Sequence, residues 1–212
     1  MSYVISCVNR KGGSGKTTSI LNLAINLSYE DKKVALLDTD PQRNALDTMD
    51  VRADPTKVKF FSISDRPHEE IDKYQDYDFV LIDSPAYNDD IARSVVICSD
   101  LVIVPIKASS LDIRGVGATI DLIDEARKQR PEILAYFLPS MIQPQTIFAK
   151  ELSKELRKKY RKMKVLDSQI TNRVAYNYAT AYGLSVTEYE RSGIASNEIN
   201  ALTKEVLQII QP

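Results

Sequence analysis

Short apolar runs alternate along this chain with longer segments in which apolar residues recur at helical spacing. The runs occupy residues 4–8, 34–37, 58–61, 79–82, 101–106 and 133–138. Several of them are apolar at successive positions, which is typical of strands buried on both faces of a parallel sheet. The helical segments cover residues 16–30, 89–98, 111–130 and 145–162. The alternation predicts an α/β fold in which a doubly wound, mostly parallel sheet carries helices on both faces.

Length and composition fit one globular domain. The chain has 212 residues, of which 43% are hydrophobic and 27% charged, and an α/β fold of this size can form a single unit. We therefore expect one domain over residues 1–212. No apolar run approaches the roughly 20 residues that span a bilayer, and no signal-peptide pattern precedes Arg10 and Lys11. We expect a cytoplasmic protein without a transmembrane segment.

A glycine-rich stretch lies between the first apolar run and the first helical segment. It reads Lys11-Gly12-Gly13-Ser14-Gly15-Lys16-Thr17-Thr18. Glycines allow successive backbone N–H groups to turn inward around a polyphosphate, and the start of the following helix favours an anion. Lys16 is placed to reach the β- and γ-phosphates, and the Thr17 hydroxyl to coordinate Mg²⁺. All eight residues are therefore predicted to bind ATP, as in a P-loop NTPase.

Aspartates end two of the predicted strands. Asp38 and Asp40 follow one apolar run, and Asp83 follows another. In such sheets ligands bind at the carboxyl ends of the strands. Asp83 has the position of a Walker B aspartate, which holds a Mg²⁺-bound water, and Asp38 is our candidate for orienting the attacking water. We predict a metal site at Thr17, Asp38 and Asp83. Asp40 is expected to lie next to these residues without binding the metal itself.

The K-G-G-x-G-K-T-T form of the loop resembles the deviant Walker A box of the ParA/MinD family of ATPases. Arg10 stands where the standard P-loop pattern has its first glycine, and Lys11 follows it. In that family this first lysine acts across a dimer on the partner's ATP, so the resemblance adds Lys11 to Lys16 and Asp38 as catalytic residues. The D-x-D-P-Q string that begins at Asp38 is similar to the family's second signature, although Arg43 replaces a glycine.

The resemblance continues through residues 99–112, which are similar to the family's A-D-x-V-I-I-P strand and the S-x-x-D turn after it. Ser84-Pro85-Ala86 departs from the D-T-P-P that is usual in the family. Beyond about the first 110 residues the match is one of outline. The adenine loop of the family would correspond to residues 171–173, which makes Asn172 a candidate adenine contact.

The resemblance implies a partition ATPase of the short ParA type, with ATP and Mg²⁺ as cofactors. In the family, ATP closes a homodimer and the dimer binds DNA without sequence preference. A centromere-binding, ParB-like adaptor accelerates the slow hydrolysis that releases the DNA, and the cycle segregates plasmids or chromosomes. The expected location is therefore cytoplasmic and nucleoid-associated.

Residues 150–164 form a basic stretch with eight lysines or arginines and two glutamates. The candidate DNA contacts, which include one arginine outside the stretch, are Lys150, Lys154, Arg157, Lys158, Lys159, Arg161, Lys162 and Arg173. In a chain of net charge −1, this local excess is enough for several phosphate contacts and a steep salt dependence. The same residues also fit a solvated helix face with i,i+4 ion pairs, and only the family resemblance favours DNA.

Two other functions stay open. A MinD-like, membrane-associated positioning ATPase shares the loop, but the apolar stripe of residues 198–210 is accompanied by a single basic residue, Lys204. A membrane-surface helix carries several, so we expect this tail to pack on the core. The second alternative is a metabolic ATP-dependent enzyme on the same fold, such as a ligase that phosphorylates a carboxylate or an iron–sulfur ATPase.

Cysteine and histidine usage limits the metal chemistry. Cys7 and Cys98 lie in apolar segments without C-x-x-C spacing, so we expect buried thiols rather than cluster ligands. His68 is the single histidine, which excludes a histidine-based metal site. Four tyrosines are expected to pack within the fold with their hydroxyls at water: Tyr176, Tyr178, Tyr182 and Tyr189.

Overall fold

A parallel sheet forms the centre of the computed structural model, which describes residues 2–53, 56–63 and 65–210. Seven strands pair in parallel in the order β3-β2-β4-β1-β5-β6-β7. They are β1 (Tyr3–Cys7), β2 (Val34–Asp38), β3 (Lys59–Ser62), β4 (Phe79–Asp83), β5 (Leu101–Ile106), β6 (Leu134–Pro139) and β7 (Lys164–Val165). The strand order runs in opposite directions on the two sides of β1, as a doubly wound sheet requires, so the predicted fold class is confirmed.

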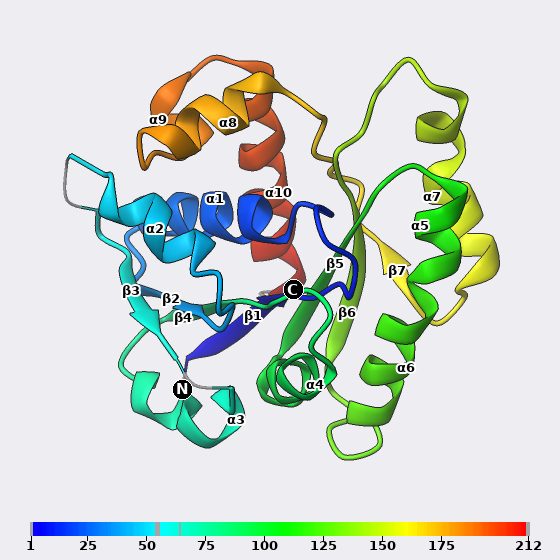
Figure 1. Cartoon of the computed structure of the whole chain (residues 1–212), viewed down its shortest axis with the longest axis horizontal. Helices are drawn as coiled ribbons and strands as arrows, with labels where there is room; N and C mark the ends of the chain where they lie inside the picture. The colour runs from blue at the N-terminus through cyan, green and yellow to red at the C-terminus, as the bar shows by residue number, and fades with distance from the viewer. Residues whose placement is uncertain (1, 54–55, 64, 211–212) are drawn as a thin grey trace.

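Helices cover both faces of the sheet (Figure 1). α1 (Lys16–Tyr29) and α10 (Ile194–Ile210) pack on one face, and α4 (Asp89–Cys98), α6 (Gly117–Ala126) and α7 (Ile147–Lys159) on the other. The shorter helices are α2 (Asn44–Asp50), α3 (Pro67–Glu70), η1 (Ile71–Tyr74), α5 (Ser110–Gly115), α8 (Val174–Ala181) and α9 (Val186–Tyr189). Because both faces are covered, the strands are apolar at successive positions, and β2, β4 and β5 are buried throughout.

The register of the central strands brings the candidate site together. Cys7, the last residue of β1, pairs with Asp83 of β4, and Asp83 in turn pairs with Asp38 of β2. The loop after β1 and the two aspartates therefore meet at one edge of the sheet, at the carboxyl ends of three adjacent strands. This is the edge at which ligands of doubly wound sheets bind.

The prediction of one continuous helix over residues 111–130 is wrong. The structure divides this segment into α5 and α6, with Gly115 and Gly117 on either side of the break. Glycine weakens a helix interior, and a Cβ at Gly115 would lie 2.7 Å from Cε of Lys11, so the side chain of Lys11 occupies that space. α6 ends at Ala126, and the residues that follow form a turn before Pro131.

The pattern of apolar residues did not predict the shortest helices and strands. β7 has two residues, α2 has seven and α9 has four, so none is long enough to show a period. α10, in contrast, packs as expected: Ile199, Leu202 and Val206 are buried. In the part of the chain that the structure describes, no helix is long and apolar enough to cross a membrane.

The cysteine prediction is confirmed, whereas the tyrosine prediction is confirmed only for the packing of Tyr176, because the hydroxyl of that residue is bonded within the fold and is not at water. Cys7 and Cys98 are buried free thiols. Tyr176 is buried, and its hydroxyl donates to Glu198 at 3.1 Å, whereas the other three tyrosines are 40–61% exposed. They lie on the outside of α8 and α9, where the rings of Tyr182 and Tyr189 stack at 6.2 Å.

Candidate active site

The phosphate loop, residues 11–18, connects β1 to α1 and has a backbone that requires glycine. Gly13 and Gly15 have φ values of 65° and 94°, in the left-handed region that side chains with a Cβ rarely adopt. A Cβ at Gly15 would also lie 2.5 Å from Oγ of Ser140, so the loop is pressed against the end of β6. The loop leads directly into the N-terminus of α1, whose free N–H groups and dipole favour an anion.

A hollow of about 410 Å³ lies over this loop. Its lining consists of residues 12–18 together with Asp40, Asn44 and Ala86. The hydroxyl of Ser14 is buried, and no hydrogen-bond partner is found for it among the described residues. A buried polar atom without a partner is costly unless a ligand satisfies it, so this atom fits a site for a polyphosphate.

Lys16 is buried at the bottom of the loop, with 7% of its surface exposed. Its Nζ donates to the backbone oxygen of Lys11 at 3.4 Å. Burial lowers the pKa of the Lys16 ammonium, and the nearby carboxylate of Asp83 partly offsets that change. A buried cation with a single long hydrogen bond is well placed to bind a phosphate oxygen.

Thr17 and Asp83 form the best-defined polar contact of the site. The Thr17 hydroxyl donates to one oxygen of Asp83 at 2.7 Å, while the other oxygen, Oδ1, is buried without a partner among the described residues. Burial raises the pKa of the Asp83 carboxyl to about 7, and the negative charge of Asp38 adds to the effect. A divalent cation would satisfy the open oxygen and remove the cost of the buried charge, so these two residues fit Mg²⁺.

Asp38 lies beside Asp83 but already accepts three backbone hydrogen bonds. Its oxygens accept from the N–H of Asp40 at 2.9 Å, of Ala45 at 3.1 Å and of Leu46 at 3.2 Å. The last two belong to the first turn of α2, so the carboxylate satisfies the start of that helix. Burial raises the pKa of Asp38, and the three N–H donors oppose that rise. The sequence predicted the position of Asp38 but not its contact with α2.

Lys11 lies at the rim of the loop and is held by its own chain. Its Nζ forms an ion pair with Asp112 of α5 at 3.3 Å, and its N–H donates to Oδ1 of Asn9 at 2.9 Å. Asp112 is positioned by a hydrogen bond from Ser109, the residue that caps α5. The ion pair is one-third exposed on the lysine side, so solvent screens it and a stronger partner can displace it.

A sequence model described as "CobQ/CobB/MinD/ParA nucleotide binding domain" matches residues 5–186, which include the loop and both aspartates. The chain belongs to this family. It is 28% identical to the maintenance of carboxysome distribution protein A of Halothiobacillus neapolitanus, over 97% of each chain. It is 25% identical to the chromosome-partitioning ATPase Soj of Thermus thermophilus, over 98% of this chain and 96% of that protein.

A solved structure with the same fold is the septum site-determining protein MinD of Pyrococcus horikoshii OT3, complexed with Mg-ADP. It has a TM-score of 0.77 and 18% identity, over 97% of this chain and 96% of that one. The fold and the nucleotide-binding family are thus those that the K-G-G-x-G-K-T-T loop indicated.

Three residues at the site of this ParA/MinD-family protein were missed by sequence reasoning. The hydroxyl of Tyr87 accepts from the N–H of Gly12 at 3.4 Å, and its ring lies 3.4 Å from the position of a Cβ on Gly12. Asn44 lines the hollow, and the hydroxyl of Ser140 is buried without a described partner. Tyr87 and Ser140 come from other strand ends, and no local motif marks them.

The candidate adenine residue lies outside the phosphate-loop hollow. Asn172 is exposed, and its N–H donates to the backbone oxygen of Ile142 at 2.8 Å, next to the segment that contacts Gly15. Its neighbour Arg173 donates to the hydroxyl of Thr171 and forms an ion pair with Glu198 at 3.7 Å. Arg173 is therefore held within the fold, apart from the basic stretch.

The basic stretch of this protein lies on α7 and the turn after it. The seven candidates in it, Lys150 to Lys162, are all exposed. Some form ion pairs, as Lys154 does with Glu151 at 3.3 Å and Arg157 with Asp167 at 3.3 Å. The predicted solvated face is thus present, although the ion pair within α7 is spaced i,i+3 and not i,i+4 as predicted, and the remaining charges are open to an anionic partner.

The raised pKa of Asp83 predicts a pH-dependent stability of the nucleotide-free protein. The folded state keeps a proton on Asp83 up to about pH 7, whereas the unfolded chain releases it near pH 3.8. The stabilisation is therefore complete below the lower value and is lost as the pH rises to the higher one. We expect the unfolding free energy of wild type, relative to Asp83→Asn, to fall by up to about 1.4 kcal/mol per pH unit over this interval.

Urea unfolding of both proteins at several pH values, without nucleotide or Mg²⁺, measures this difference. Comparison with Asp83→Asn cancels the other titrating groups. A difference that stays constant from pH 5 to 7 would show that Asp83 is ionised in the folded state.

Proposed function

We propose that this protein is a partition-type ATPase. ATP binding closes a homodimer with Lys11 of each copy reaching the nucleotide of the other, the dimer binds DNA without sequence preference, and slow hydrolysis releases it. The observation that carries the proposal is the pair of lysines: Lys16 is buried under the phosphate loop, whereas Lys11 lies on its rim in a partly exposed ion pair with Asp112. Because solvent screens that ion pair, Lys11 could exchange Asp112 for the phosphates bound by a second copy.

Each step is assigned to residues of the chain. The loop N–H groups, the Ser14 hydroxyl and Lys16 would hold the β- and γ-phosphates, and Thr17 and Asp83 would hold Mg²⁺, directly or through water. Bound Mg²⁺ would neutralise charge on the phosphates. Asp38, next to Asp83 in the sheet, would orient the attacking water.

Dimer closure is supported by apolar side chains around the loop. Tyr87, beside Gly12, is 78% exposed, and Leu111, which precedes Asp112, is 68% exposed. Large apolar side chains exposed next to a polar site are typical of surfaces that a partner covers. A second copy placed over the loop would cover both of them.

DNA binding is assigned to the basic residues of α7, and an adaptor of the ParB type is the proposed stimulating partner on the nucleoid. The MinD-like alternative is less well supported, because the apolar stripe of α10 packs against α1 and is not available to a membrane. A metabolic enzyme of this fold would turn over with a small substrate, independently of DNA.

Binding to random-sequence duplex DNA tests the proposal. We expect binding with ATP or a slowly hydrolysed analogue but not with ADP, and affinity that falls linearly with salt on a log–log plot. Lys158→Ala/Arg161→Ala removes two exposed charges, so the slope should decrease in magnitude by about 1.8. Lys128→Ala/Lys204→Ala, which removes two exposed charges outside α7, is the matched control and should leave the slope unchanged. Absence of binding in every nucleotide state would contradict the DNA step.

A further inference from the structure

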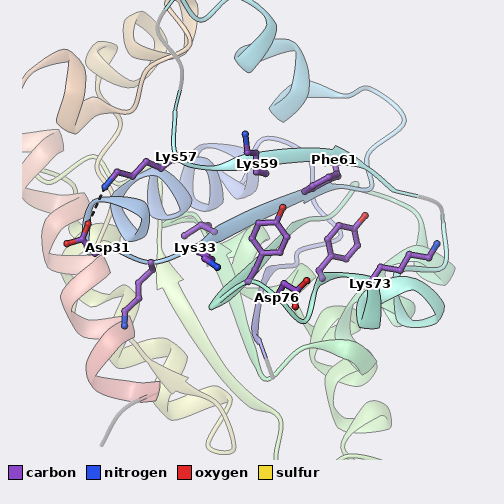
Figure 2. Close-up of a pocket in the computed structure, with 11 residues that line it drawn as sticks. Asp31, Lys33, Lys57, Lys59, Phe61, Lys73 and Asp76 are labelled. Carbon is purple, nitrogen blue, oxygen red and sulfur yellow. Dashed lines mark hydrogen bonds and ion pairs between the residues drawn. The ribbon is translucent and has the colours of Figure 1, made fainter.

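A second and larger hollow lies away from the phosphate loop, at the edge of the sheet that β3 forms (Figure 2). Its volume is about 720 Å³, against about 410 Å³ for the hollow over the loop. We call it the lysine hollow, and it is lined by Asp31, Lys32, Lys33, Val34, Lys57, Lys59, Phe61, Lys73, Tyr74, Asp76 and Tyr77. Three segments form it: the turn before β2, the strand β3 with the residues that precede it, and the end of η1 with its connection to β4.

The lysine hollow is strongly positive. Five lysines line it against two aspartates, and Glu70 outside the lining neutralises one lysine, which leaves an excess of two positive charges in a chain whose net charge is −1. Two of the lysines are engaged: Lys57 with Asp31 at 3.2 Å, and Lys73 with Glu70 at 2.8 Å. For the others, Lys32, Lys33 and Lys59, no side-chain partner is found among the described residues. Cations gathered around a recess favour an anionic ligand.

Aromatic rings line one end of the lysine hollow. The ring of Phe61 packs edge-to-face on Tyr74 at 5.0 Å and on Tyr77 at 6.2 Å. All three residues are only half-buried, so each still presents ring surface. Figure 2 shows Lys57, Lys59 and Phe61 following one another along one side of the hollow, with Lys73 near the aromatic end. An occupant would meet charge along its length and apolar surface at one end.

The backbone of β3 adds a third feature. β3 ends the sheet, and within the described residues it pairs on one side only, with β2. Side chains alternate along a strand, so Lys59 and Phe61 lie on the same face, and Phe60 lies on the other. An extended peptide added beside β3 would place every second side chain over that same face. We propose that the lysine hollow binds an extended acidic segment of a partner protein, with an aromatic residue among its acidic ones.

Other occupants fit these features less well. If β3 of a second copy paired with β3 of this one, the lysines of the two copies would lie close together. Their repulsion would oppose such pairing, as lysines on edge strands commonly do. A stiff duplex binds to charges that project from a surface, whereas these line a recess. The basic residues of α7 are also distant in the sheet, because α7 contacts β7, at the edge opposite β3. The lysine hollow is therefore separate from the proposed DNA surface.

Fluorescence anisotropy of a labelled peptide of sequence DEDFDEDE, with the full-length protein, tests the proposal. Lys33→Glu/Lys59→Glu reverses two exposed charges of the hollow and should weaken binding at least about tenfold. Lys128→Glu/Lys204→Glu, at two exposed positions outside the hollow and outside α7, makes the same change in net charge and should alter the affinity less than about twofold. Circular dichroism of both variants checks that the fold is kept.

A second peptide separates a specific site from general attraction. Replacing its phenylalanine by glycine leaves the charge unchanged, and it should bind at least about threefold more weakly because it loses the contact with the rings. Equal losses in the two protein variants, or no saturable binding by wild type, would overturn the proposal. A single-stranded oligonucleotide that displaces the peptide and binds more tightly, with loss in Lys33→Glu/Lys59→Glu, would assign the hollow to nucleic acid and also overturn it.

Discussion

Lys16→Ala is expected to abolish ATP binding at concentrations that saturate the wild-type protein. The ammonium is buried beneath the phosphate loop and would form charge-assisted hydrogen bonds with the phosphates. Loss of two such bonds corresponds to about 3 kcal/mol, a decrease in affinity on the order of 100-fold or more. Isothermal titration calorimetry with ATP and Mg²⁺ measures it.

The control for this variant is Lys107→Ala. The ammonium of Lys107 lies 3.4 Å from the position of a Cβ on Gly13, so this residue is also close to the loop. Lys107 directly follows β5, however, and it is not buried. We expect Lys107→Ala to change ATP affinity less than Lys16→Ala does. ATP affinity in Lys16→Ala equal to that of wild type would refute the assignment of the phosphate loop.

Asp38→Ala is expected to bind ATP and to dimerise but not to turn over. Loss of a group that positions the water corresponds to a rate decrease on the order of 100- to 10,000-fold. The structure adds an effect on stability: without the carboxylate, the N–H groups of Ala45 and Leu46 lose their acceptor, at a cost of about 1–2 kcal/mol. Single-turnover hydrolysis and thermal unfolding separate the two effects.

Asp38→Asn is the informative comparison. The amide keeps one oxygen that accepts from the backbone but loses the charge, so it should recover part of the stability and none of the turnover. Wild-type turnover in Asp38→Ala or Asp38→Asn would assign the catalytic role elsewhere. Loss of turnover only in the variant that also unfolds α2 would make Asp38 a positioning residue for that helix.

The parts of the site that the sequence predicted depend on patterns of residues that are close together along the chain. A strand, a glycine loop and a helix follow one another between Tyr3 and Tyr29, and the two aspartates each end an apolar run. Their approach then follows from the parallel register, which pairs Asp38 with Asp83. The apolar stripe of α10 was equally informative, because a helix of 17 residues shows its period clearly.

The parts that it missed depend on contacts between residues distant in the chain. The ion pair of Lys11 with Asp112 joins positions about a hundred residues apart, and the same lysine occupies the space beside Gly115 that ends α5. The lysine hollow draws on three separate segments, none of which has a motif. Three tyrosines at α8 and α9 are exposed although aromatic residues usually pack inside a fold, and neither helix is long enough for its sequence to indicate which face is outward.

The tight fit of Gly15 against Ser140 places the phosphate loop directly against the end of β6. A Cβ at residue 15 would be 2.5 Å from the hydroxyl of Ser140, and the next residue, Met141, has a φ of 53°, so this corner has little freedom to yield. The corner leads through Thr146, the cap of α7, into the helix that carries the basic residues. Replacement of Gly15 by a residue with a Cβ would therefore have to displace the start of the segment that leads from β6 to α7, so the shape of the phosphate loop and that of this segment depend on each other.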